Sequence, residues 1–342
     1  MTIDKALIKT IAATAPTCDD FAILQPVEIG RKSHRNELLL FVKPEIFMVK
    51  DVAQVEAALD LVFTKLAEFG AVVSGVAVVG GKVLEEAEIM NRHYGYINRL
   101  SRFASQMVDD PAGGAEDKQK IAEALGIPNL DGITIYGGHE YLKAHPDEDC
   151  FALDELWFTK KSIKIRSGFY VQRYNKDDED FILINGFHPA QLMHFTDPTH
   201  RIVLVLIHAD TPWATLRNEM VGATFPEKAV PHSIRGTLYA HAEDYGLGTV
   251  SIANNSVHLS AGPFEGLFEI NNFFGEILDL DIKKQQPLLL KKMLAAGLSM
   301  QTALKTLENP IVSDSPKPTD LFTATEDVDS DEAVALWKQA NA

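Results

Sequence analysis

The stretch LLLFVKPEIFMVKDVAQVEAALDLVFTKLAEFGAVVSGVAVV, residues 38–79, contains the pattern that decides the fold. It opens with a continuous apolar run, 38–42, which has the length of a buried strand and ends at Lys43-Pro44. Asp51 stands where a helix N-cap belongs, and apolar residues then recur with the spacing of one helical face. Gly70 ends that pattern, and a second apolar run, 71–79, follows it. The stretch therefore predicts a strand, a helix and a strand.

A second block further along the chain repeats this order. RIVLVLI, residues 201–207, predicts a buried strand, and a helix is expected over about 211–221. A strand over 249–253 and a helix over 263–274 complete the block. Together the two blocks give a βαββαβ order, which predicts an α+β fold: a ferredoxin-like sandwich, with an antiparallel sheet and helices on one face.

The pattern divides the chain into four regions. Residues 1–36 form an N-terminal extension, and 37–103 together with 200–275 form the core. The middle, 104–199, is richer in charged loops and is expected to be an α/β insertion with a sheet of its own. Residues 276–342 are expected to form a C-terminal helical extension, and the acidic last thirty or so, rich in Pro, Ser and Thr, a mobile tail.

Composition excludes several classes of function. The chain has 342 residues, with 32 Lys and Arg against 48 Asp and Glu, a net charge of -16. Such a surface repels nucleic acid and acidic membranes. The two cysteines, Cys18 and Cys150, are too few for a disulfide framework or a Cys-rich zinc site. No apolar run has the length of a membrane span, and the N-terminus lacks the pattern of a signal peptide, so a cytoplasmic location is expected.

The segment NNSVHLSAGP, residues 254–263, is the first candidate for chemistry. It is expected to follow a strand and open a helix, which places His258 where backbone N–H groups favour an anion. Glu269 lies eleven positions on, among apolar neighbours, where a carboxylate needs a partner. A carboxylate that holds one ring nitrogen of His258 would leave the other to act as a nucleophile. Taken alone, the segment is more simply interpreted as a capping loop with a surface histidine and an exposed glutamate.

Two further segments carry cations. GATFPEKAVPHSIRG, residues 222–236, is a loop after a helix, with Arg235 at its exit. Its planar guanidinium suits phosphate oxygens, although a solvated surface arginine is the simpler alternative. Lys43 ends an otherwise apolar strand and is either a phosphate ligand or a side chain that reaches the solvent at the strand end.

Other signals are weaker. His188 and His194 have no third ligand at a suitable spacing, so two unrelated histidines are a better interpretation than a metal pair, and no metal site is predicted. Gly80-Gly81-Lys82 lacks the remaining residues of a phosphate-binding P-loop and indicates a turn at a strand end.

Taken together, these segments resemble the nucleoside diphosphate kinase family over roughly 38–103 and 200–274. The resemblance is strongest over 222–274, where GAT-x-P, SIRG, N-x-x-H-x-S and the later glutamate keep the family's order. It implies the same ferredoxin-like fold. It also implies roles for individual residues. His258 would accept the phosphate, and Glu269 would orient the imidazole of His258. The remaining matches are a strand-end lysine for the phosphate (Lys43), phosphate ligands (Arg235 and Thr224), a sugar ligand (Asn255), the residues beside the histidine (Tyr94 and Ser260) and an aromatic for base stacking (Phe103).

Three positions depart from the family's pattern. Leu259 and Ala261 stand where the family has Gly and Asp, which is expected to narrow the loop and to remove an acidic contact. Asn218 takes the place of a further phosphate-binding arginine, and a shift of helix register would present Arg217 instead.

The resemblance implies reversible transfer of the terminal phosphate between nucleoside tri- and diphosphates through a phosphohistidine, with Mg²⁺ bridging the phosphates of ATP or another triphosphate. It also implies a homo-oligomer whose partners are nucleotides, with no nucleic acid and no membrane. Leu259, Ala261 and Asn218 favour an alternative, a nucleotide-binding sensor or scaffold with weakened turnover. An assembly protein that uses the insertion and the C-terminal helices is a third possibility.

Overall fold

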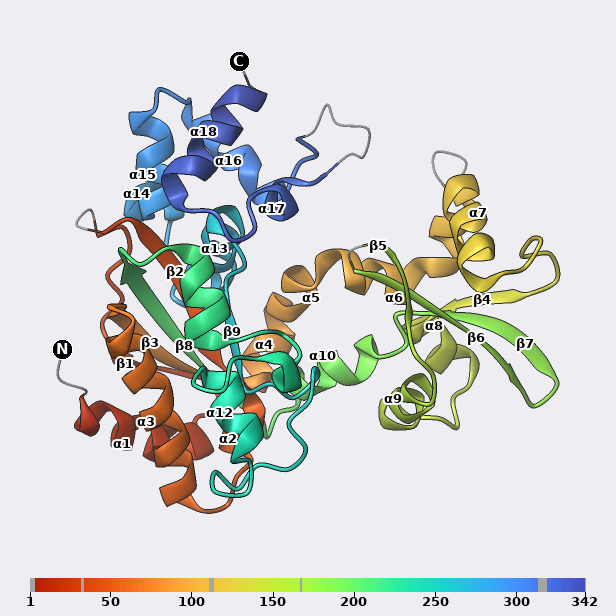
Figure 1. The fold of residues 1–342 in the computed structure, drawn as a ribbon, viewed down its shortest axis with the longest axis horizontal. Coiled ribbons are helices and arrows are strands. Elements are labelled where there is room, and N and C mark those ends of the chain that lie inside the picture. Colours follow the sequence, from red (N-terminus) through yellow and green to blue (C-terminus); the bar gives the residue numbers. More distant parts are fainter. Residues whose placement is uncertain (1–3, 32–33, 111–113, 167, 313–318, 342) are drawn as a thin grey trace. The chain divides into compact units, whose positions relative to one another are not determined.

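The computed structural model describes residues 4–31, 34–110, 114–166, 168–312 and 319–341. They form two compact units, each with its own sheet (Figure 1). The first unit comprises Met1–Ile89 and Phe195–Ala342, and the second comprises Met90–His194. Helices α5 (Ile89–His93) and α10 (His188–Thr196) contain the two points at which the chain passes between the units.

A five-stranded antiparallel sheet forms the centre of the first unit. Its strands lie in the order β1-β3-β8-β2-β9, and every neighbouring pair is antiparallel. They are β1 (Phe21–Gln25), β2 (Asn36–Val42), β3 (Val72–Gly80), β8 (Arg201–Ala209) and β9 (Val257–Leu259). The α+β class and the antiparallel sheet are therefore as predicted, and the order β3-β8-β2-β9 is compatible with a ferredoxin-like arrangement. Strand β1, which comes from the N-terminal extension, pairs with β3 at the edge.

One predicted strand is wrong. Residues 249–253 form no strand, and the sheet is completed by 257–259 instead. Asn254 and Asn255 follow the mispredicted segment, and the Asn255 side chain bonds to the backbone carbonyl groups of Ile252 and Thr224. Such side-chain bonds to the backbone compete with strand pairing. His258 therefore lies inside a short strand rather than in a loop beyond one.

One face of the sheet carries the predicted helix α3 (Val52–Glu68), together with α1 (Lys5–Thr14) and α12 (Ile234–Ala240), as Figure 1 shows. Residues 234–236 were expected to be part of a loop, and α12 begins there instead. Asp51 is the N-cap of helix α3, and its carboxylate accepts a hydrogen bond from the backbone N–H of Ala53. Its apolar stripe packs into the same core as Leu38, Leu40 and Val42 of β2. Burial of each such side chain contributes about 1.5–3 kcal/mol.

The prediction of helices on one face only is wrong, because the other face is also covered. Leu39 and Phe41 point away from the first core, as the two-residue alternation of a strand requires, and both are fully buried. The Phe41 ring lies 5.6 Å from that of Phe273 and 6.0 Å from that of Phe195. Helix α13 (Pro263–Ile270) and the π-helical turn η4 (Asn271–Gly275) supply much of this cover. Strand β2 is consequently buried along its whole length.

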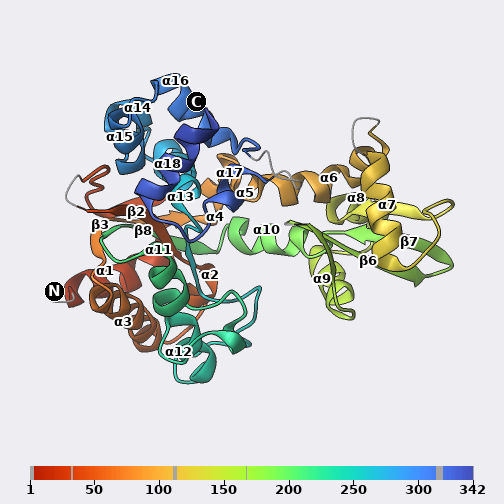
Figure 2. The ribbon, with the colours of Figure 1, turned by 45° about the horizontal axis from the view of Figure 1, so that its top comes forward.

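The C-terminal extension packs on α13, and Figure 2 shows its helices on the opposite side of the sheet from α1 and α3. Phe264, Leu290, Met293 and Trp337 are part of one buried cluster. The expectation of a mobile tail is wrong for 330–340, which form a helix; residues 313–318 lie outside the described part of the chain. The helices here are α14 (Ile282–Gln285), α15 (Leu288–Ala295), α16 (Met300–Leu304), α17 (Leu321–Ala324) and α18 (Ser330–Ala340).

Shorter helical segments complete the first unit: α2 (Pro44–Phe47), α4 (Gly81–Glu86), α11 (Trp213–Thr215), the 3₁₀ turns η1 (Ala15–Thr17), η3 (Pro226–Lys228) and η5 (Lys305–Glu308), and the π-helical turn η2 (Leu216–Val221).

The second unit has a four-stranded mixed sheet in the order β4-β7-β6-β5, in which only β4 and β7 are parallel. Its boundaries, Met90 and His194, differ from the expected 104 and 199. His188 is buried, and its ring nitrogens lie 3.1 Å from Gln191 Oε1 and 3.3 Å from Asn98 Oδ1. The elements are α6 (Gly95–Asp109), α7 (Gly114–Leu125), β4 (Thr134–Gly137), α8 (Gly138–Ala144), α9 (Cys150–Phe158), β5 (Ile163–Arg166), β6 (Phe169–Lys176) and β7 (Glu179–Ile184).

Within the described ranges of both units, no helix combines the length and the apolar character needed to cross a membrane.

Candidate functional site

His258 lies in β9 directly opposite Phe41 of β2. Opposite residues of an antiparallel pair share a face of the sheet, so the imidazole lies on the face that α13 covers. The two rings stack, with centroids 4.4 Å apart and planes inclined by 17°. Phe41 therefore fixes the plane of the imidazole, and the side chain of His258 remains 20% exposed.

Glu269 of α13 binds the imidazole at the edge of its ring. Its carboxylate is fully buried, and Oε1 lies 2.5 Å from Nε2 of His258. Ser260 Oγ donates to Oε2 of the same carboxylate at 2.5 Å and accepts a hydrogen bond from the Leu39 backbone N–H at 3.0 Å. An ionised carboxylate only accepts, so Nε2 carries a proton and Nδ1 carries the ring's lone pair. The structure thus joins three residues that the sequence singled out: His258, Glu269 and Ser260.

The electrostatic surroundings favour the neutral imidazole. Burial lowers the pKa of His258 well below its ordinary value, and the positive charges of Lys43, Arg235 and Arg217 lower it further. A neutral imidazole with a lone pair is the nucleophilic form of histidine. Lys43 and Arg235 are two of the phosphate ligands that the resemblance implied, and Arg217 is the residue that a shift of helix register was expected to present; the charges of all three act on one ring.

Lys43 continues the alternation of β2, because its backbone is extended and it lies two residues beyond Phe41. Its backbone N–H donates to the Ser256 carbonyl at 2.9 Å, and its Nζ donates to Asn255 Oδ1 at 2.6 Å. The residue is 8% exposed, and burial lowers the pKa of Lys43 to about 8, although the carboxylate of Glu45 opposes the shift. A buried lysine at a strand end is a candidate anion ligand rather than a side chain that reaches the solvent.

Arg235, near the start of α12, holds two segments of backbone. One terminal nitrogen donates to the Gly222 carbonyl and the other to the Val257 carbonyl, each at 2.9 Å. Its Nε is buried and has no hydrogen-bond partner within the described ranges. Burial lowers the pKa of Arg235 to about 10, and the charge of Arg217 adds to this effect. The guanidinium therefore remains charged at neutral pH, and it ties β9 to the end of η2.

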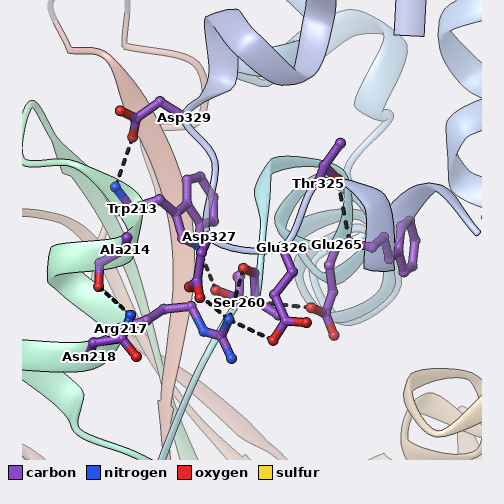
Figure 3. Close-up of polar contacts among 12 residues, drawn as sticks. Trp213, Ala214, Arg217, Asn218, Ser260, Glu265, Thr325, Glu326, Asp327 and Asp329 are labelled. Atoms are coloured by element: carbon purple, nitrogen blue, oxygen red, sulfur yellow. Dashed lines mark hydrogen bonds and ion pairs between the residues drawn. The ribbon is translucent and has the colours of Figure 1, made fainter. Parts of the chain in front are cut away.

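Arg217, and not Asn218, faces the turn after His258. Arg217 NH1 lies 3.4 Å from the Ala261 carbonyl oxygen, whereas the Asn218 amide donates to the Ala214 carbonyl of its own helix. The π-helical turn η2 includes both residues, and such a turn accommodates an extra residue and so shifts the helix register. Two side-chain carboxylates from the C-terminal extension bind Arg217. Its NH1 donates to Glu326 Oε1 and to Asp327 Oδ1, at 2.8 Å each (Figure 3). Burial opposes ionisation, but these two carboxylates outweigh it and raise the pKa of Arg217.

The remaining predicted residues divide between the two units. Asn255 is buried and links Lys43 to the carbonyl of Thr224, whose own side chain is exposed. Tyr94 and Phe103, which the sequence assigned to the core, belong to the second unit. There Tyr94 makes an edge contact with the His188 ring at 5.7 Å, and Phe103 lies at a kink in α6 and is 47% exposed.

The two departures beside Ser260 have different outcomes. The expectation that Leu259 narrows the loop is wrong, because its side chain points to the opposite face and is buried in the core of α3. Ala261 leaves only its backbone at the position of the family's acid. Its N–H donates to Glu265 Oε2 at 2.9 Å, and burial together with the nearby charge of Glu269 raises the pKa of Glu265 to about 8.

Further residues of this site, besides Phe41, were not expected from the sequence. Glu45 Oε1 accepts a hydrogen bond from the Ser256 backbone N–H at 2.7 Å, which fixes the turn before β9. Ser256 adopts φ 68°, and its hydroxyl is buried with no partner in the part of the chain that is described. Glu265 was detectable in principle, because an acid three residues after Gly262 is typical of a helix start.

Comparison with known proteins adds little. No family model and no curated protein matches the chain. Among solved structures it is similar to a crystal structure of an NDP kinase from Pyrobaculum aerophilum, with 16% sequence identity and a TM-score of 0.33 over 70% of this chain and 95% of that chain.

Proposed function

We propose that this protein is a phosphotransferase of the nucleoside diphosphate kinase type, which passes the terminal phosphate of a nucleoside triphosphate to a nucleoside diphosphate through a phosphohistidine at His258. The observation that carries the proposal is the contact of the buried Glu269 carboxylate with His258 Nε2 at 2.5 Å, within the field of three cations. We further propose that the sheet of the first unit is ferredoxin-like. The order β3-β8-β2-β9 supports this, with one strand added at the β3 edge.

In the first half-reaction, Nδ1 of His258 attacks the γ-phosphorus. A phosphorus–nitrogen bond forms, the bond to the bridging oxygen breaks, and the nucleoside diphosphate leaves with that electron pair. In the second, a terminal oxygen of another diphosphate attacks the phosphohistidine, and the phosphorus–nitrogen bond breaks. Glu269 keeps the proton of the imidazole at Nε2 and stabilises the positive charge that the ring acquires.

Phosphoryl transfer depends mainly on position and on neutralisation of charge. Lys43, Arg217 and Arg235 would supply the neutralisation, and Phe41 would hold the imidazole in line. Mg²⁺ would enter as part of the nucleotide substrate and would add to the neutralisation of its phosphates. Glu45, whose charge acts on Lys43 and Arg235, is a nearby carboxylate that would help to hold it.

A nucleotide sensor with weakened turnover is the second candidate. The observation that favours it is that the two arginines are already held by carbonyl or carboxylate oxygens, whereas Lys43 donates to the neutral amide of Asn255. Arg235 holds the carbonyls of Gly222 and Val257, and Arg217 holds two carboxylates. A sensor would bind nucleotide through Lys43 and Asn255 without forming a phosphoenzyme.

The test is incubation with γ-³²P-labelled ATP and Mg²⁺. We expect an acid-labile, base-stable phosphoprotein in the wild type, loss of the label when nucleoside diphosphates are added, and no label in His258→Ala. His241→Ala removes an exposed histidine of the same unit and is the matched control, which should label normally. Label that persists in His258→Ala contradicts the proposal. Calorimetric binding of nucleotide without any label supports the sensor instead.

A further inference from the structure

The segment between α17 and α18 places two acidic side chains on Arg217. Glu326 Oε1 and Asp327 Oδ1 each lie 2.8 Å from the same guanidinium nitrogen, NH1, as Figure 3 shows. Arg217 is one of the cations whose charge reaches His258. The two carboxylates therefore take up a guanidinium that would otherwise be offered to an anion at that histidine.

Backbone contacts hold this segment directly on the turn after His258. The Asp327 N–H donates to the Ala261 carbonyl oxygen at 3.0 Å, and that oxygen is also 3.4 Å from Arg217 NH1. The carbonyl oxygen of Thr325 packs on Gly262 so closely that a Cβ there would come within 2.3 Å of it. The position of the two acids against the site is thus built into the chain path.

Asp329 anchors the segment between α17 and α18, whereas Glu326 and Asp327 bind Arg217. Asp329 is buried, and its Oδ1 accepts hydrogen bonds from Asn36 Nδ2 at 2.7 Å and from the Trp213 backbone N–H at 2.8 Å. By contrast, the side chains of Glu326 and Asp327 are 50% and 38% exposed. The two carboxylates can therefore swing into solvent while Asp329 and the backbone keep the segment in place.

We propose that Glu326 and Asp327 are an internal competitor for the phosphates of the substrate. The inference rests on the proposed function and adds regulation of the same site. Their carboxylates occupy Arg217 when the site is empty, and a polyphosphate chain, with more charge and more acceptor oxygens, displaces them and gains the guanidinium as a ligand. If the carboxylates hold Arg217 about nine-tenths of the time, the apparent Kd for a polyphosphate that needs it is raised about tenfold.

The experiment measures binding of inorganic tripolyphosphate by calorimetry to the full chain. In Glu326→Gln/Asp327→Asn we expect binding about tenfold tighter than in the wild type. Glu308→Gln/Glu332→Gln removes two exposed acids elsewhere in the C-terminal extension and is the matched control, which should change Kd less than about twofold. Adding Arg217→Ala to the first double variant should abolish its gain.

Binding that is unchanged or weaker in Glu326→Gln/Asp327→Asn overturns the inference, as does a gain that survives Arg217→Ala or appears equally in the control. A second measurement leaves both acids in place and uses NMR spectra of the wild type. The Nε–H signal of Arg217, assigned by its absence in Arg217→Lys, should shift when tripolyphosphate is added. Failure here is distinct from failure of the proposed function. Phosphorylation of His258 with no effect of the acids refutes only the competitor, whereas release of Arg217 without any phosphoenzyme refutes only the transfer reaction.

Discussion

Raising the pH through 8 is expected to weaken capture of the triphosphate, because Lys43 loses its charge there. Burial lowers the pKa of Lys43 to about 8, from about 10.4 for an unperturbed lysine. A lysine is cationic below its pKa, so the productive form of the enzyme is present at neutral pH and is lost on the alkaline side. The cationic fraction is about one half at pH 8, about a tenth at pH 9 and about a hundredth at pH 10. The value of kcat/KM should therefore fall about tenfold per pH unit above 8.

The assay measures the initial rate of His258 phosphorylation by labelled ATP between pH 6 and 10. It is run first at an ATP concentration far below saturation and then at one far above it. The low-concentration rate reports the free enzyme, so its midpoint should lie near the pKa of Lys43. At saturation, the bound triphosphate stabilises the ammonium ion, and the midpoint should move to higher pH. Because the pKa of His258 is lowered, no loss of rate is expected between pH 8 and pH 6.5.

Lys43→Arg is the control, since a guanidinium, even one buried like that of Arg235, remains mostly charged up to about pH 9. The variant should be slower, because its contact with Asn255 changes, but its profile should lack the midpoint near 8. A midpoint near 10 in the wild type would indicate Arg235 as the titrating group instead. A profile that is flat to pH 10, or a midpoint near 8 that persists in Lys43→Arg, refutes the reasoning.

Three further outcomes are expected. Ser260→Ala removes a hydrogen bond to Glu269 and should lower the rate of His258 phosphorylation. It should also lower the free energy of unfolding, measured by urea titration, by about 1–3 kcal/mol. An unchanged rate would mean that Glu269 does not need this hydrogen bond. Glu265→Gln should gain stability over the wild type as pH rises, because a carboxyl whose pKa is raised to about 8 stabilises the fold below its unfolded pKa and loses that contribution by pH 8; a difference in Tm that is constant from pH 5 to 9 would contradict this. Asp329→Ala leaves the Trp213 N–H without its partner and should cost about 1–3 kcal/mol in thermal unfolding, and an unaltered Tm would show that the anchor is unimportant.

The strands and the long helix of the first unit were predictable because their signals are local. The apolar runs 38–42, 71–79 and 201–207 coincide with β2, β3 and β8, and the face pattern after Asp51 coincides with α3. Strand β9 was not predictable in the same way. It has three residues, one of them His258, and so falls below the length at which an apolar run or an alternation can be recognised.

The candidate site was predictable to the extent that short motifs fix short distances. Residues separated by eleven positions, His258 and Glu269, meet because a strand end leads directly into α13. The carboxylates on Arg217 come from about 110 residues further along the chain, and no local pattern marks them. Arg217 itself required knowledge of the π-helical turn, since a regular helix gives no reason to prefer it to Asn218.

One strand links the core to the chemistry. In β2, Leu38, Leu40 and Val42 face the core beneath α3, while Leu39 and Phe41 face α13, and the extended chain carries Lys43 to that same side. Phe41 stacks on His258, the backbone of Leu39 holds Ser260, and Lys43 supplies charge. Side chains in a strand alternate between the two faces of the sheet. A slip of one residue in β2 would therefore turn Leu38, Leu40 and Val42 away from the core and, at the same time, turn Phe41 and Lys43 away from His258. Selection for a stable core therefore also fixes the register of the site. For this reason, the wholly apolar run before Lys43 is the feature from which both the fold and the proposed phosphate-binding face follow.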